Sequence, residues 1–145
     1  MFARRIYTPP PAPHARPVTR RFTYASDDQI VAAPKHDYIR SPALLAAVRT
    51  LPCQHTDVPG QTEAAHSNWG WGKGRGIKCD DNRVAALCRS VHRELDQGSR
   101  WSEARRQVVW WHAHVRTVHA LILDGLWPAG VPVPDTHNCP FWDVE

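Results

Sequence analysis

Three polar residues are the strongest candidates for chemistry: His66, Asn82 and His92, which follow one another at intervals of sixteen and ten residues. Asp96 lies four residues after His92, so on a helix both side chains would project from one face and could bind one divalent cation. A histidine such as His66 can accept a proton from water. A base and a cation together can hydrolyse a phosphate ester, because the cation neutralises charge on the phosphate and the departing oxygen.

A glycine-rich segment with three cations lies between His66 and Asn82. Residues 70–76 read Gly-Trp-Gly-Lys-Gly-Arg-Gly, a composition typical of a loop. This order does not match the GxxxxGK[ST] pattern of nucleotide-binding P-loops. We expect Lys73, Arg75 and Lys78 to hold the phosphates next to the reacting one.

A hairpin followed by a helix would bring these residues together. Residues 62–66 and 83–87 are short, largely apolar runs that predict strands. A short helix is predicted from residue 89 to about 97, with Gly98 at its end. His66 would then end the first strand, Asn82 would precede the second and His92 would lie on the helix, so that all three can face one cleft.

Two further helices are predicted around this unit. Ser41 and Pro42 suit the cap and the first position of a helix that ends before Pro52. A longer helix follows Ser102 and stops at Gly125. Residues spaced by three and four predict its packing face: Trp101, Ala104, Val108, Trp111, Val115, Val118 and Ile122. Trp110 is expected to be semi-exposed.

Three histidines are expected on separate, solvated faces, with no metal bound: His112, His114 and His119.

Length and composition indicate the domain number, the class of partner and the character of the two terminal segments. Its 145 residues have room for one compact domain, and a net charge of +4 favours a polyanionic partner. Residues 1–38 are rich in Pro and Arg and predict a disordered basic arm, which is either a solvated tail or a phosphate-binding arm. Residues 129–145 predict an irregular tail. No apolar run is long enough to span a membrane, so we expect a cytoplasmic protein.

Four motifs in order resemble a known nuclease group. They lie at Ala64–Asn68, Gly72–Lys78, Asp81–Cys88 and His92–Gly98. Across residues 41–128 the chain resembles small prophage nucleases of the YbcO type, which belong to the HNH, or ββα-metal, superfamily. The resemblance implies an α+β fold with a treble-clef-like ββα-metal core and a long C-terminal helix. It also implies that His66 is the general base, that Asn82 orients His66 or the strands, that His92 and Asp96 bind Mg²⁺ or a similar ion, and that DNA is the substrate.

The chain departs from this group at two places. Relatives usually hold a structural zinc with two CxxC knuckles, whereas here Cys53 is followed by Thr56 and Cys88 by Val91. Cys53 and Cys88 are therefore residual zinc-site positions. His55 or Cys79 could substitute, but structural zinc needs four ligands, so we expect no zinc and apolar packing around Val91 instead.

Many HNH enzymes also place a metal ligand just before the base, where this chain has Ala65. Asp80 or Asp81 is then a candidate to complete the metal shell. The expected function is a metal-dependent HNH-type DNA endonuclease, in phage or prophage DNA metabolism. The alternative is a non-catalytic DNA-binding or phage accessory protein on a degenerate HNH fold.

Overall fold

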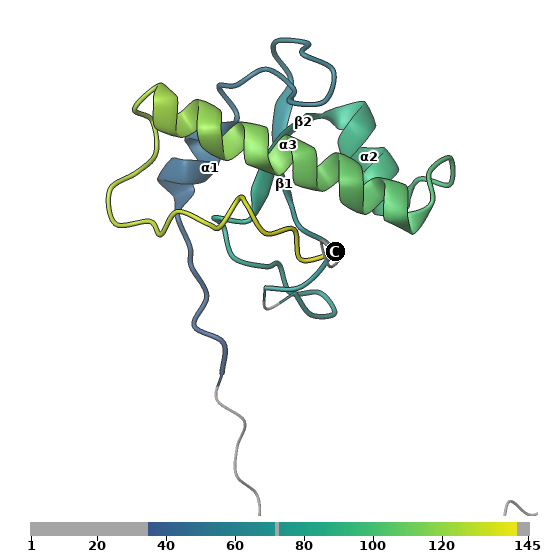
Figure 1. Cartoon of the computed structure of the whole chain (residues 1–145), viewed down its shortest axis with the longest axis horizontal. Helices are drawn as coiled ribbons and strands as arrows, with labels where there is room; N and C mark the ends of the chain where they lie inside the picture. Colours follow the sequence, from purple (N-terminus) through teal and green to yellow (C-terminus); the bar gives the residue numbers. More distant parts are fainter. Residues whose placement is uncertain (1–34, 72, 142–145) are drawn as a thin grey trace, which may run out of the picture. The chain divides into compact units, whose positions relative to one another are not determined.

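The computed structural model describes residues 35–71 and 73–141. Within these residues the protein is a small α+β structure with three helices and one two-stranded antiparallel sheet (Figure 1). The elements are α1 (Pro42–Val48), β1 (Thr62–His66), β2 (Val84–Cys88), α2 (Arg89–Gln97) and α3 (Glu103–Leu123). The expected helices and strands are confirmed, with β2 one residue later in the chain than predicted. The expected basic arm, residues 1–38, lies outside the described residues except for 35–38.

Local hydrogen bonds explain where the helices begin and end. Ser41 Oγ accepts a hydrogen bond from Leu44 N at 3.2 Å, and Ser102 Oγ accepts one from Arg105 N at 3.2 Å, so both serines cap helices as expected. At the end of α2, a Cβ at Gly98 would collide with Glu94. The close approach lets the buried Glu94 carboxylate accept the backbone N–H groups that follow α2, which fixes the turn into α3.

Successive side chains of β2 point to opposite faces of the hairpin, and each face packs against its own core cluster. Ala85 and Leu87 face a cluster shared with α2 and α3, whereas Val84 and Ala86 face a cluster shared with α1 and the end of α3. All four are at most 2% exposed, so β2 is covered on both faces. In the register of the hairpin His66 pairs with Val84. Figure 1 shows α3 crossing the hairpin.

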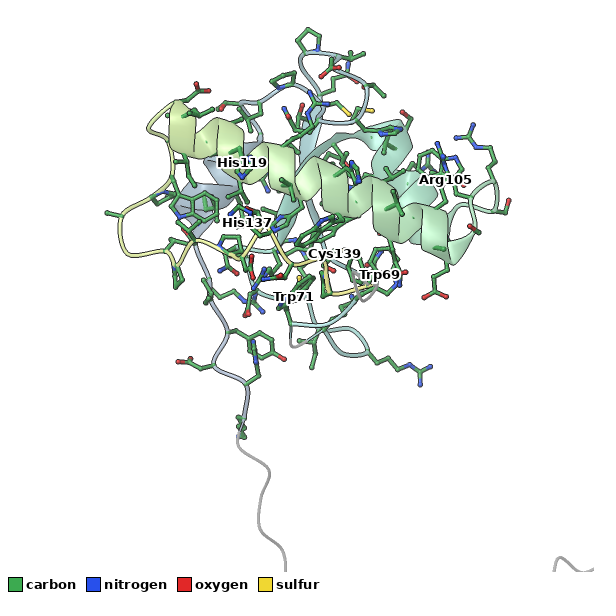
Figure 2. All side chains as sticks on the ribbon, in the orientation of Figure 1. Trp69, Trp71, Arg105, His119, His137 and Cys139 are labelled. Carbon is green, nitrogen blue, oxygen red and sulfur yellow. The ribbon has the colours of Figure 1, made fainter. Side chains whose placement is uncertain are left out.

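The predicted packing face of α3 is partly wrong. Trp110 is 1% exposed rather than semi-exposed, while Val108 and Ile122 are 40% and 44% exposed. The physical reason is a second covering layer, since residues 129–141 have no helix or strand but return along α3 (Figure 1). Phe141 contacts the rings of both Trp110 and Trp111. Figure 2 shows Trp69, Trp71 and Cys139 together on one side of α3, where they pack against this core.

His114 is likewise buried, contrary to the expectation that it is solvated. Its ring stacks on Trp110 with a centroid distance of 4.8 Å, and Nδ1 lies 2.7 Å from the Val84 carbonyl oxygen. Burial lowers the pKa of His114 to about 4, so the imidazole is a neutral core residue near pH 7. Among the described residues, no helix is both long and apolar enough to span a membrane.

Candidate functional site

His66 and His92 line one hollow of about 200 Å³. His66 is the last residue of β1, and His92 lies in the middle of α2. Because α2 follows β2 without a loop, the hairpin and the helix bring the two histidines to the same place. The residues that line the hollow are Ala64, His66, Asn68, Lys73, Lys78, His92 and Asp96.

His66 is held by a carboxylate. Its side chain is 13% exposed, and Nε2 lies 2.8 Å from Oδ1 of Asp81. Burial lowers the pKa of His66, and the hydrogen bond and charge of Asp81 offset this only in part. The imidazole is therefore neutral near pH 7. In the tautomer that donates Nε2–H to Asp81, Nδ1 carries the free lone pair.

The segment before α1 holds Asp81 in place. The second oxygen of Asp81 accepts a hydrogen bond from the backbone N–H of Ser41 at 2.8 Å, and Arg40 Nη1 lies 3.5 Å from the first. Burial alone would raise the pKa of Asp81, but the hydrogen bonds from His66 and the Ser41 backbone and the charges of His66 and Arg40 lower it. Asp81 is therefore ionised and firmly oriented.

Asp80 or Asp81 is the candidate that the sequence offers to complete a metal shell, but the contacts of both carboxylates lie elsewhere. Neither carboxylate lines the hollow. Asp80 accepts hydrogen bonds from His36 Nε2 at 2.9 Å and from Ile39 N at 3.1 Å, whereas Asp81 is engaged by His66 and Ser41. The turn between the glycine loop and β2 directs both side chains towards the segment before α1.

His92 lies between two carboxylates. Nδ1 lies 2.7 Å from Oε2 of Glu63 on β1, and Nε2 lies 3.3 Å from Oδ2 of Asp96. The other Asp96 oxygen accepts a hydrogen bond from Asn68 Nδ2 at 2.7 Å. Sequence reasoning missed both Glu63 and Asn68. The hairpin register pairs Glu63 with Leu87, which lies two residues before α2. The closeness of Glu63 to the start of the helix that bears His92 is the signal that could have identified it.

Two residues predicted for the site lie elsewhere. Asn82 is 4% exposed and does not line the hollow; its Nδ2 donates a hydrogen bond to the Pro132 carbonyl oxygen at 3.0 Å. It therefore ties the turn before β2 to the C-terminal segment, while Asp81 is the residue that contacts His66. Arg75 is exposed on the glycine loop and, unlike Lys73 and Lys78, does not line the hollow.

The donor atoms of His92 and Asp96 suit a divalent cation. With Nδ1–H donated to Glu63, Nε2 and Oδ2 are two acceptors that face each other at 3.3 Å, and they need a proton or a cation between them. A carboxylate on the other ring nitrogen is the usual arrangement around a metal-binding histidine. In residues 35–71 and 73–141 no group of three or more His, Cys, Asp or Glu side chains is arranged to hold a metal. Mg²⁺ is nevertheless usually held by only one or two carboxylates together with waters and substrate phosphate, and Asp96 supplies one such carboxylate.

Cys53 and Cys88 meet in the core, at the junction of β2 and α2. Cys53 is fully buried in the cluster that contains Val91, and Cys88 packs against that cluster. Thr56 Oγ1 lies 3.9 Å from Cys88 Sγ. Burial alone would raise the pKa of the Cys88 thiol, but hydrogen bonds from Ser90, the Val91 backbone, Cys53 and Thr56 lower it to about 7. Val91 is 7% exposed, so apolar packing is present around it as expected.

No family model, curated protein or solved structure matches this chain. The function therefore has to be inferred from the site itself.

Proposed function

We propose that this protein is a metal-dependent phosphodiesterase of the HNH type that cleaves DNA. The observation that carries the proposal is the hollow in which a neutral His66, positioned by Asp81, faces the pair formed by His92 and Asp96. Lys73 and Lys78 line the same hollow. A base, a site for a divalent cation and two phosphate-binding cations are the parts that hydrolysis of a phosphodiester requires.

His66 acts as the general base in this proposal. Its Nε2 is occupied by Asp81, so Nδ1 is the atom that accepts a proton from water. Asp81 fixes the ring orientation and the tautomer, and it stabilises the imidazolium that forms when the proton is taken. The lowered pKa of His66 keeps the base in its unprotonated form at neutral pH.

His92 and Asp96 would hold the cation. Glu63 accepts Nδ1–H of His92, which leaves the Nε2 lone pair on the side of Asp96, and Asn68 holds the other Asp96 oxygen. When bound, a divalent ion supplies charge neutralisation on the phosphate and on the departing oxygen. Lys73 and Lys78 bind phosphate oxygens and keep the scissile bond within reach of His66.

The resemblance to HNH nucleases gains support from the arrangement of the hairpin and helix. We assign β1, β2 and α2 to a ββα-metal core, because β2 passes directly into the helix that bears His92. The four positions that correspond to the two zinc knuckles of relatives also lie together: Cys53, Thr56, Cys88 and Val91. The same scaffold then persists with an apolar and thiol cluster in place of a zinc site.

Plasmid cleavage tests the proposal. Purified protein is incubated with supercoiled plasmid and with single-stranded DNA, in Mg²⁺ or Mn²⁺, beside an EDTA control. We expect metal-dependent cutting that His66→Ala abolishes and that His112→Ala, at an exposed histidine of α3, leaves unchanged. Cutting by His66→Ala at the wild-type rate would overturn the assignment of the base. DNA binding without cutting by the wild-type protein would instead favour a non-catalytic DNA-binding or phage accessory protein, in which two cation ligands are the remnant of a former centre.

A further inference from the structure

A second hollow, of about 270 Å³, adjoins the first on the far side of His92. His92 and Asp96 line both hollows, so the two adjoin at these side chains. The glycine-loop lysines, Lys73 and Lys78, line only the first hollow. The second is lined by Glu63, Arg89, His92, Arg93, Asp96 and Gln97.

Arg89 and Arg93 are exposed cations without partners in the part of the chain that the structure describes. They lie four residues apart on α2, so they project from one face of the helix. Two further exposed arginines do have carboxylate partners, Arg100 with Glu94 and Arg116 with Asp57. The carboxylates nearest to Arg89 and Arg93 in the hollow are engaged elsewhere, since Glu63 and Asp96 both contact His92.

The position of Arg89 is also costly for the helix. Arg89 is the first residue of α2, whose first turn contains no acidic residue. A cation at a helix N-terminus opposes the helix dipole and so destabilises the helix. Helix stability therefore does not account for a cation at this position.

We propose that Arg89 and Arg93 bind backbone phosphates on the opposite side of the reacting phosphate from Lys73 and Lys78. A nucleic-acid strand then crosses His92 and Asp96 from one cationic pair to the other. The bound strand then has phosphates held on both sides of the reacting phosphate. The identity of the cleaved bond rests on the proposed function, whereas the phosphate contacts do not.

Salt-dependent DNA binding tests this inference. The affinity for a fluorescein-labelled 20-base-pair duplex and for its single strand is measured by anisotropy across a salt series, in EDTA so that metal-dependent cutting is absent. The variants are Arg89→Gln/Arg93→Gln, Lys73→Gln/Lys78→Gln and Arg49→Gln. Arg49 is an exposed arginine that follows α1 and lines neither hollow, so it serves as the matched control.

We expect both double variants to bind duplex DNA about tenfold more weakly at physiological salt. The slope of log K against log[salt] should become shallower by about 0.9 for each phosphate that the variant no longer neutralises. Arg49→Gln should match the wild type. Wild-type affinity and slope in Arg89→Gln/Arg93→Gln would overturn the inference, as would a wild-type protein that binds no DNA. Undiminished cutting by His66→Ala would reject the base assignment and leave this binding result standing, so the two failures are distinguishable.

Discussion

The contact between His66 and Asp81 makes the proposed base resemble the histidine of a hydrolytic triad more than an isolated imidazole. Asp81 has two effects on His66, one on its pKa and one on its tautomer. Burial lowers the pKa of the His66 ring, and Asp81 raises it again in part. Asp81 also fixes the tautomer in which Nδ1 accepts the proton. The balance places the pKa of His66 below its ordinary value of about 6.5.

The pH dependence of cleavage follows from this balance. The base is active only when unprotonated, so we expect cleavage to rise with pH through an inflection below about 6.5 and then to level off. Asp81→Asn removes the charge that raises the pKa of His66, so the inflection should move to lower pH, while the plateau falls by on the order of 10²- to 10⁴-fold. Rates measured from pH 4.5 to 8 test both effects. Asp80→Asn, which affects the partner of His36, is the control and should keep the wild-type inflection.

Glu63 is predicted to act through His92 rather than on the substrate. Glu63→Gln weakens the acceptor for Nδ1–H of His92, and such outer-shell changes typically cost about 10–100-fold in metal affinity. We expect the Mg²⁺ or Mn²⁺ concentration at half-maximal cleavage to rise by that factor, with most of the rate regained at saturating metal. Asp124→Asn, at the exposed end of α3, is the matched control. An unchanged metal dependence in Glu63→Gln would show that the contact does not position His92.

At the scale of elements, the junction of β2 and α2 brings Cys88, which occupies the N-cap position of α2, next to Cys53 and Thr56. Hydrogen bonds lower the pKa of Cys88 to about 7, whereas burial raises that of Cys79 to about 11. We expect iodoacetamide to alkylate Cys88 with a rate that inflects near pH 7 and to leave Cys79 unmodified in the folded protein. Mass spectrometry of peptides identifies the modified cysteine. Ser90→Ala removes one of the hydrogen bonds and should shift the inflection upward; an inflection that stays in place would exclude Ser90 as a cause.

The elements could largely be predicted from the sequence because their ends carry local signals. Ser41 and Ser102 cap helices, and the hairpin strands are short apolar runs between turn residues. The pairing of His92 with Asp96 also follows from helical spacing. What could not be predicted depends on long-range contacts. Asp81 contacts His66 only because the turn before β2 meets Ser41, forty residues earlier, and Trp110 is buried because Phe141 returns to α3.

At the scale of the whole molecule, the part of the chain that the structure describes packs α1 and the end of α3 on one face of the hairpin, and α2 with the rest of α3 on the other. Small residues make this possible, since Ala65, Ala85 and Ala86 are fully buried and let the helices approach the strands closely. Polar groups from α3 reach the strands directly. Thr117 Oγ1 accepts the Ala86 N–H at 2.9 Å, and His114 and Trp110 donate to the backbone of β2 and β1. The site therefore depends on α3, although no residue of α3 lines the hollow that contains His66.

His114 links this packing to acid stability. Its pKa is about 4 in the folded protein and about 6.5 when unfolded, so the unfolded chain binds more protons between these values. The free energy of unfolding should therefore fall as pH decreases from about 6.5 to 4, by about 3 kcal/mol in total from this residue. His114→Phe keeps an aromatic ring against Trp110 but leaves the Val84 carbonyl without its donor, at a cost of about 1–3 kcal/mol near pH 7.

Urea unfolding of both proteins at pH 7 and pH 4.5 separates the two effects. We expect His114→Phe to be the less stable protein at pH 7 and to lose less stability than the wild type on acidification. The exposed His112 provides the control, because His112→Phe should retain the wild-type difference between the two pH values. An equal loss in wild type and His114→Phe would mean that His114 is not the group that couples the packing of α3 on the hairpin to pH.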